Sequence, residues 1–547
     1  MNHLKNLTLD GSYHDDFYST LATMASIAKI ETLVLDEDLT ESPSASRDLA
    51  QFICKMNNLK NLTLRGDYHD DFYSTLSSMA SIAKIETLVL DEDLTESPSA
   101  SRDLAQFICK MNNLKNLTLR GDYHDDFYST LSSMASIAKI ETLVLDEYLT
   151  KSPSVSRDLA QFICKMNNLK NLTLRGNYHD DFYSTLLSMA SIAKTETLRH
   201  DGNLSERPSA SRDLAQFICK MNHLKNLTLD GSYHDDFYST LASMASIAKI
   251  ETLFLDEDLT ESPSASRDLA QFICKMNNLK NLTLRGDYHD DFYSTLSSMA
   301  SIAKIETLVL DEDLTESPSA SRDLAQFICK MNNLKNLTLR GDYHDDFYST
   351  LSSMASIAKI ETLVLDEYLT KSPSVSRDLA QFICKMNNLK NLTLRGNYHD
   401  DFYSTLLSMA SIAKIECLNI IRVDLSQRLS ASRDLAQFIC KMPNLRELCL
   451  GNEYGTTSPS LHEEFYSTLS SLASSAKIER LNIICVDLSQ RLSASRDLAQ
   501  FICKMPNLRE LHLGGKYGTT RPSLHEEFYS TLSSLASTVK VLHVLAE

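Results

Sequence analysis

The residue run with the clearest chemical potential is Tyr68-His69-Asp70-Asp71, which occurs eight times along the chain. An imidazole beside two carboxylates could bind a divalent metal ion. Adjacent side chains rarely converge on one point, however, and a metal site needs three or four ligands that do. Because an amphipathic segment follows each copy, the run favours acids that cap a helix, with His69 in the preceding loop.

A second candidate is a strip of charged residues that follows short apolar segments. Parallel strands would bring these residues side by side at about 4.8 Å. Opposite charges there favour correct stacking, although exposed pairs contribute only about 0–1 kcal/mol. Stacking is therefore the favoured role, and a charged strip for a protein ligand is the alternative. The strip runs Asp36, Arg65, Asp91, Arg120, Asp146, Arg175, Asp201, Asp230 and Asp256.

The alternation of charge breaks at Asp201, Asp230 and Asp256, which are three acids in succession. A ligand could distinguish this part of the surface from the rest. The same region holds His200, which replaces the leucine found at Leu90 in the regular copy. A buried, unpaired histidine is costly. Local loosening of the fold is the favoured interpretation, and a distinct binding spot is the alternative.

Cysteine usage gives no sign of a metal or redox centre. Nine of the 12 cysteines lie in the recurring string Phe-Ile-Cys-Lys, and no Cys-x-x-Cys occurs. Reduced thiols are the simplest interpretation, with Cys109 packed against an adjacent helix. Each potential nucleophile or base also recurs many times, whereas catalysis needs one arranged site. The sequence therefore predicts no enzyme, with no catalytic, cofactor-binding or metal-binding residues.

These residues sit in a repeat that fills the chain. The string Leu-Lys-Asn-Leu-Thr-Leu recurs every 55 residues from Leu4, and Ile-Glu-Thr-Leu-Val-Leu recurs between its copies from Ile30. The two strings are separated alternately by 26 and 29 residues, so each 55-residue double repeat contains two unlike halves. Ten of each give 20 repeat units. Residues 1–194 also match residues 221–414, apart from Thr23/Ser243 and Val34/Phe254, which indicates either a very recent tandem duplication or an error in the assembly of the sequence.

Each half of the double repeat reads as a strand followed by a helix. Leu62 and Leu64 alternate with polar residues, which is typical of a strand with one buried face. Residues 70–84 and 98–111 each carry an apolar stripe at helical spacing. Ser97 and Pro98 suit the start of the second helix.

The predicted fold is an α/β right-handed solenoid, or horseshoe, with a parallel sheet on its concave face and helices on its convex face. We expect one solenoid over residues 1–547, with regular double repeats at 1–414 and diverged ones at 415–547. The expected protein contacts lie on the concave face. They are Asn61, Thr63, Arg65, Thr87, Val89, Asp91, Arg120, Asp146, Arg199, Asp201, Asp230 and Asp256.

Alternating L-x-x-L-x-L repeats with full helices resemble leucine-rich repeats of the ribonuclease-inhibitor type. The runs at 438–448 and 501–511, with Phe-Ile-Cys-Lys-Met-Pro-Asn-Leu-Arg-Glu-Leu, further resemble the C-terminal repeats of NOD-like (NACHT) receptors. The resemblance implies a ligand-sensing or autoinhibitory region of an innate immune receptor. The sequence departs from the repeat pattern where Asp67 and Asp93 replace the usual Asn or Cys, which predicts looser turns. It also lacks the nucleotide-binding string G-x-x-x-x-G-K-[S/T].

Net charge and hydropathy exclude some classes of binding partner and suggest a location. The net charge of −18 disfavours nucleic acid and anionic membranes. No apolar run suits a membrane helix or a secretory signal, so the expected location is cytoplasmic. Met1 aligns with Met221 inside the array, which predicts that it is an internal methionine of a longer protein.

We expect a protein ligand or an intramolecular domain as partner, no cofactor, and a monomer when the chain is alone. Two alternatives to the receptor interpretation remain. One is a free-standing protein that binds and blocks another protein, as ribonuclease-inhibitor-like proteins do. The other is a non-functional receptor fragment.

Overall fold

The structure is a computed structural model that forms two compact units, an N-terminal unit (Met1–Asn278) and a C-terminal unit (Leu279–Glu547). The residues it describes are 4–11, 13–25, 29–79, 84–134, 139–149, 152–189, 194–244, 249–299, 304–354, 359–369, 372–451, 460–484, 486–514, 523–535 and 543–545.

Strands and helices alternate through the N-terminal unit. Its strands are β1 (Asn6–Asp10), β2 (Thr32–Leu39), β3 (Asn61–Tyr68), β4 (Thr87–Leu94), β5 (Asn116–Tyr123), β6 (Thr142–Leu149), β7 (Asn171–Tyr178), β8 (Thr197–Leu204), β9 (Asn226–Tyr233) and β10 (Thr252–Leu259). Its helices are α1 (Asp15–Met24), α2 (Pro43–Lys55), α3 (Asp70–Met79), α4 (Pro98–Lys110), α5 (Asp125–Met134), α6 (Pro153–Lys165), α7 (Asp180–Met189), α8 (Pro208–Lys220), α9 (Asp235–Met244) and α10 (Pro263–Lys275).

The C-terminal unit continues the alternation and adds short strands in its diverged part. Its strands are β11 (Asn281–Tyr288), β12 (Thr307–Leu314), β13 (Asn336–Tyr343), β14 (Thr362–Leu369), β15 (Asn391–Tyr398), β16 (Cys417–Ile421), β17 (Asp424–Leu425), β18 (Glu447–Leu450), β19 (Ser460–Leu461), β20 (Arg480–Ile483), β21 (Asp487–Leu488), β22 (Glu510–Leu513), β23 (Ser523–Leu524) and β24 (His543–Leu545). Its helices are α11 (Asp290–Met299), α12 (Pro318–Lys330), α13 (Asp345–Met354), α14 (Pro373–Lys385), α15 (Asp400–Met409), α16 (Leu429–Lys441), α17 (Glu463–Leu472), α18 (Leu492–Lys504) and α19 (Glu526–Leu535), with short 3-10 turns η8 (Ala410–Ile412) and η9 (Ala473–Ser475).

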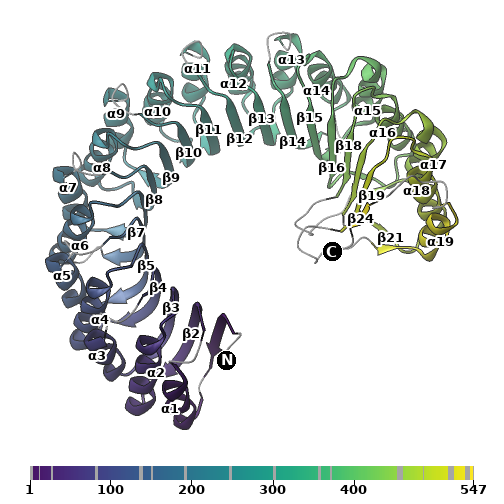
Figure 1. Ribbon diagram of the computed structural model, residues 1–547. Coiled ribbons are helices and arrows are strands. Elements are labelled where there is room, and N and C mark those ends of the chain that lie inside the picture. The colour runs from purple at the N-terminus through teal and green to yellow at the C-terminus, as the bar shows by residue number, and fades with distance from the viewer. Residues whose placement is uncertain are drawn as a thin grey trace. The chain divides into compact units, whose positions relative to one another are not determined.

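Each unit is built on a parallel sheet whose strands pair in chain order. In the N-terminal unit β1 to β10 form this ladder. In the C-terminal unit it runs from β11 through β16, β18, β20 and β22 to β24. Within each unit the strands line the inner side and the helices cover the outer side (Figure 1). The predicted leucine-rich-repeat solenoid architecture is therefore confirmed.

The strands are longer than the repeat pattern predicts. The strands β2 to β15 contain eight residues each, so the chain stays extended where a looser turn was expected at Asp67 and Asp93. The alternation continues through the added residues, and Glu92 and Leu94 follow Leu90 into the core. The expected turn at this point is wrong, because the buried Glu92 and Leu94 extend the inward-facing row.

Glycine makes room for this extension on the neighbouring strand. Gly66 lies in register with Glu37 of β2 and has a φ of +95°. A Cβ added to Gly66 would lie 2.3 Å from the carbonyl oxygen of Glu37. Glycine is the residue that allows both this φ and this close approach. The alternation of Glu and Gly thus lets unlike strands stack closely.

Helix starts differ from the prediction at the Tyr-His-Asp-Asp run. The acids were expected to cap the helix, but Nδ1 of His69 accepts a hydrogen bond from the backbone N–H of Asp71, at 3.2 Å. Asp70 instead accepts hydrogen bonds from the hydroxyls of Ser97 and Ser99, which begin the next helix. The imidazole is nearer the unpaired N–H groups, so it caps the helix while the first acid connects neighbouring repeats.

The core is dominated by leucine and aromatic side chains. Leu62 and Leu64 are at most 1% exposed, and burying each leucine contributes about 1.5–3 kcal/mol. Behind them Tyr68 stacks on Phe72, with ring centroids 4.3 Å apart, and Phe72 meets Tyr73 edge-on at 5.3 Å. The same three aromatic side chains recur in other regular double repeats, where they fill the space between a strand and the helix that follows it.

We expect Gly66→Ala to destabilise the β2–β3 pair more than Gly11→Ala destabilises β1. Both glycines have a positive φ, which costs alanine about 1–2 kcal/mol. A Cβ at Gly11 meets no atom within 4 Å, whereas one at Gly66 overlaps Glu37 and adds about 1–3 kcal/mol. Faster hydrogen exchange of the β2 and β3 amides would report the difference. Equal effects of the two substitutions would show that the close approach is unimportant.

Candidate functional site

The predicted contact residues all lie on the inner face of the N-terminal unit, on β3 to β6 and β8 to β10. Arg65 and Asp91 are exposed, and the other ten are partly exposed. The helices of the unit lie on the opposite face of the sheet (Figure 1). The structure therefore brings these residues onto one accessible surface, as the alternation of the strands requires.

The side chains at the first position of each strand form hydrogen bonds between neighbouring strands. The side-chain amide of Asn61 donates to the hydroxyl of Thr32 at 3.1 Å, and Asn116 donates to Thr87 at 3.2 Å. Similar bonds join the strands farther along. The side chains of Asn61 and Thr87 therefore connect neighbouring strands. A ligand would compete with these bonds for the same polar groups.

The strip of charged residues forms in the predicted register. Asp36 aligns with Arg65, Arg65 with Asp91, and Asp91 with Arg120. The same alternation continues to Asp146 and Arg175. The Nε atoms of Arg120 and Arg175 are buried without a hydrogen-bond partner. Side-by-side charges of opposite sign favour this order of strands.

The strip changes at the end of the N-terminal unit. Asp201 aligns with Asp230, and Asp230 aligns with Asp256, so three carboxyl groups lie on consecutive strands. Arg199, which occupies the place of Val89, reaches Asp230 through an ion pair of 2.7 Å. Burial raises the pKa of Asp201, and the charge of Asp230 raises it further, while Arg199 opposes both. This is a local arrangement that the uniform repeats lack.

His200 lies directly beneath this part of the surface. It is 0% exposed, and β8 pairs with both neighbouring strands, so the expected local loosening is wrong. Nε2 lies 3.2 Å from the hydroxyl of Tyr183, and Nδ1 lies 2.9 Å from the hydroxyl of Tyr233. Burial lowers the pKa of His200 to about 3, so the ring is neutral at pH 7. Two tyrosines meet the hydrogen-bonding needs that made an unpaired histidine unfavourable.

The regular repeats explain why this histidine fits. There the helix tyrosine bonds to a buried glutamate, as Tyr73 does to Glu92 at 2.7 Å. In β8 the position of that glutamate is Gly202, and His200 supplies the partner for Tyr183 from two residues earlier. The buried glutamates and tyrosines were missed in the sequence. The continued alternation Leu88, Leu90, Glu92 and Leu94 is the signal that could have found them.

Other candidates give no separate chemical site. The described residues hold no group of three or more His, Cys, Asp or Glu side chains that could bind a metal ion. Asp70 and Asp71 of the repeated run are bonded to Ser97 and Arg47 instead. The nine cysteines of the recurring Phe-Ile-Cys-Lys string are free thiols, and burial raises the pKa of Cys109 to about 12. None of the described helices is long and apolar enough to cross a membrane.

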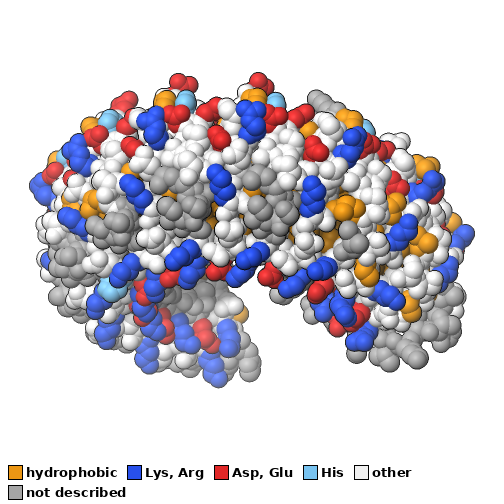
Figure 2. Space-filling model, turned by 90° about the horizontal axis from the view of Figure 1, so that it is seen from above, with side chains coloured by type: hydrophobic (Ala, Val, Ile, Leu, Met, Phe, Trp, Pro, Cys, Tyr) orange, Lys and Arg blue, Asp and Glu red, His pale blue; other side chains and the backbone are white. Residues whose placement is uncertain are grey.

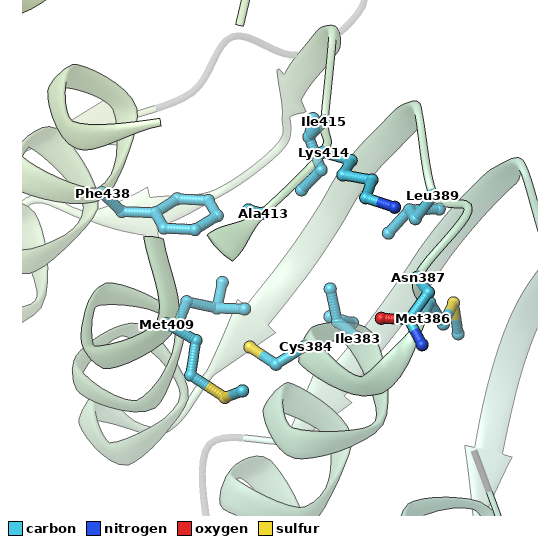
Figure 3. Close-up of a pocket in the computed structure, with 11 residues that line it drawn as sticks. Ile383, Cys384, Met386, Asn387, Leu389, Met409, Ala413, Lys414, Ile415 and Phe438 are labelled. Atoms are coloured by element: carbon cyan, nitrogen blue, oxygen red, sulfur yellow. The ribbon is translucent and has the colours of Figure 1, made fainter. Parts of the chain in front are cut away.

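A small cavity of about 60 Å³ lies in the C-terminal unit. Its walls come from α14, α15, α16 and the segment before β16, and include Cys384, Met409 and Phe438 (Figure 3). Burial raises the pKa of Cys384 to about 12, so its thiol is protonated. The same residue types stand at equivalent positions in the preceding double repeat. A cavity of this volume has room for a few water molecules.

The outer surface has mixed charge. On the face seen in Figure 2, Lys and Arg side chains alternate with Asp and Glu among uncharged ones, and hydrophobic side chains are scattered. Ion pairs also join neighbouring helices, such as Arg47 of α2 with Asp71 of α3 and Arg102 of α4 with Asp126 of α5. Such half-exposed pairs contribute about 0–1 kcal/mol each.

Comparison with known proteins adds little to this description. No protein-family model matches the chain, and no curated protein sequence matches it. A solved structure of the Toll–Spatzle complex, described as a molecular hub in Drosophila development and innate immunity, aligns with 93% of this chain at 12% identity and a TM-score of 0.38. The chain covers 61% of the length of that protein chain. A likeness of this size carries no information about function.

We expect His200→Leu to destabilise β8 by about 1–3 kcal/mol, because the hydroxyl of Tyr183 loses its partner. His200→Leu combined with Gly202→Glu should recover much of that loss, since it restores the residue types of Leu90 and Glu92. The double substitution requires a small shift of β8, because a Cβ at Gly202 would lie 2.7 Å from the carbonyl oxygen of Gly176. Hydrogen exchange of the β8 amides measures the coupling, and additive effects would contradict it.

His200 should also make the protein less stable in acid. Its pKa falls from 6.5 to about 3 on folding, so the unfolded chain binds the extra proton between these values. The stability it contributes is present above pH 6.5 and is lost as the pH falls toward 3. His200→Gln keeps polar atoms for both tyrosines but cannot titrate. The urea midpoint of the parent should therefore fall relative to that of His200→Gln between pH 7 and pH 4, and a constant difference between the two midpoints would refute the assignment.

Proposed function

We propose that the chain is a protein-binding scaffold and that its partner contacts the inner face of the N-terminal unit around β8 to β10. Repeat solenoids typically bind through such an extended inner surface. The observation that carries the proposal is the local change at Arg199, Asp201 and Asp230, where an ion pair and adjacent carboxyl groups replace the regular alternation. A partner can distinguish this region from the rest of the inner face, because the other repeats present nearly identical residues.

The physical features of this surface suit a polar protein segment. Asp201, Asp230 and Asp256 are partly exposed and lie at the spacing of neighbouring strands. Phe254, which replaces the valine of the other copy, adds a partly exposed aromatic ring on β10 next to them. Aromatic side chains and arginine, here Phe254 and Arg199, are enriched where proteins contact each other.

Site-specific photocrosslinking tests the location of binding. A photoreactive residue at Thr228, which lies in register with Arg199 and Phe254, should capture a partner protein in cells. Thr63 is the matched control, because it occupies the same position in the uniform part of the sheet, and exposed Ser78 on α3 is the control for the outer face. Equal capture at Thr228 and Thr63 would contradict a role for the altered strip. Capture at Ser78 alone would contradict binding on the inner face.

We further propose, from the resemblance at 438–448 and 501–511, that the scaffold is the ligand-sensing or autoinhibitory repeat region of a cytoplasmic NOD-like immune receptor. Its partner would then be a protein ligand or another domain of the same polypeptide. Full-length transcripts should extend in frame to a nucleotide-binding region, and the protein should fractionate with the cytosol. Complete transcripts that encode the repeats alone would favour a free-standing inhibitor-like binder instead.

A further inference from the structure

In the described part of the chain, β2, β4, β6, β10 and β12 each bury one glutamate in the core behind the inner face of the sheet. Each side chain takes an inward-facing position of its strand, as Glu92 does between Leu90 and Leu94, and the exposed fractions of the glutamates are between 0% and 4%. Charged residues are almost never this deeply buried unless they are paired. The described examples are Glu37, Glu92, Glu147, Glu257 and Glu312.

Each of these carboxyl groups has one hydrogen-bond partner. The phenol of Tyr73 donates to Oε2 of Glu92 at 2.7 Å, and Tyr128 donates to Glu147 at 2.5 Å. The same bond joins the other three glutamates to the tyrosine of the preceding helix. The second oxygen, Oε1, is buried without a hydrogen-bond partner in all five.

The surroundings of Glu92 are negative or uncharged. Besides Tyr73 of α3, the groups that face it are Asp67 and Tyr68 of β3, Tyr123 of β5 and Asp91 of its own strand. The charges among them that act on Glu92 are the carboxylates of Asp67 and Asp91, which both disfavour a further negative charge. Glu147 has the equivalent neighbours Asp122 and Asp146.

A buried carboxylate with one hydrogen bond and negative neighbours is strongly destabilised relative to its neutral form. Burial, the largest cause, raises the pKa of Glu92, Glu147 and Glu312 to about 8, against the opposing effect of the tyrosine bond. Burial also raises the pKa of Glu37 and of Glu257. The repeated burial, the single hydrogen bond and the missing partner of Oε1 therefore favour the protonated carboxyl group, as the raised pKa does.

We propose that each buried glutamate holds a proton on its carboxyl group in the folded chain at neutral pH, so that alkali loosens the repeat array from within. The neutral acid can sit in the core with a single tyrosine bond, whereas the carboxylate formed in alkali cannot. Loss of this proton destabilises each repeat that carries a buried glutamate. Because the arrangement recurs, the losses of stability add up along the repeats.

The sign of the pH dependence follows from the raised pKa. Between pH 4.5 and about 8 the folded chain binds more protons than the unfolded chain. The stability that these glutamates contribute is therefore fully present below pH 4.5 and is lost as the pH rises through 8. This dependence is opposite to that of His200, which destabilises the fold in acid.

Infrared spectroscopy of the full chain tests the proposal directly. The carbonyl band of protonated carboxylic acids should persist at pH 7, where exposed glutamates with a pKa near 4.3 are ionised. Glu92→Gln should remove the share of one carboxyl group from this band, and Glu92→Gln with Glu147→Gln and Glu312→Gln should remove more. Glu86→Gln is the matched control, because Glu86 pairs with Lys115 at 2.8 Å and its pKa is lowered.

Urea unfolding followed by circular dichroism gives a second readout. The midpoint of the parent chain should fall from pH 5 to pH 9, and the triple variant should lose most of that fall. If the triple variant does not fold, Glu92→Gln alone still alters the infrared band. The proposal is overturned if no protonated-carboxyl band is present at pH 7, or if Glu92→Gln leaves the band unchanged.

Discussion

The inward leucines of each strand are covered only because the strands and helices of neighbouring repeats stack against them in strict register. Leu62 of β3 aligns with Leu33 of β2 and with Leu88 of β4, and all three are buried. A one-residue slip would turn such leucines toward solvent and bring polar residues into the core. Each repeat therefore derives its stability from its neighbours, as expected for a solenoid.

Polar groups in the core adjust to one another within this register. In the regular repeats a tyrosine depends on a glutamate, and the glutamate fits because the next strand carries glycine. In β8 the glutamate is replaced by Gly202 and the leucine by His200, so the tyrosine keeps a partner. A change at either position alone would leave a buried polar group without its bond, which is why the two differences from the regular copy belong together.

Much of the architecture could be predicted from the sequence, because the spacing of leucines defines the strands and a fixed period defines their stacking. The alignment of Asp36, Arg65 and Asp91 followed directly from that period. The length of the strands could not be predicted, because Glu92 looks like a surface residue until its tyrosine partner is known. The cap from His69 was also missed, since short-range distances decide between an imidazole and the acids beside it. The role of His200 depended on Tyr183 and Tyr233, which come from other repeats.

The pairing of unlike strands also governs how such a chain can change in length. Glu37 lies beside Gly66 and Asp36 beside Arg65, so an even-numbered strand placed against another even-numbered strand would bring two glutamates together. Gain or loss of a single half-repeat would create that conflict at the junction. Gain or loss of a complete 55-residue double repeat would again place an even-numbered strand beside an odd-numbered one at the new seam. Unequal exchange between gene copies can therefore lengthen or shorten this protein in whole double repeats without a packing defect, and the 220-residue offset between its two matching blocks equals four of them.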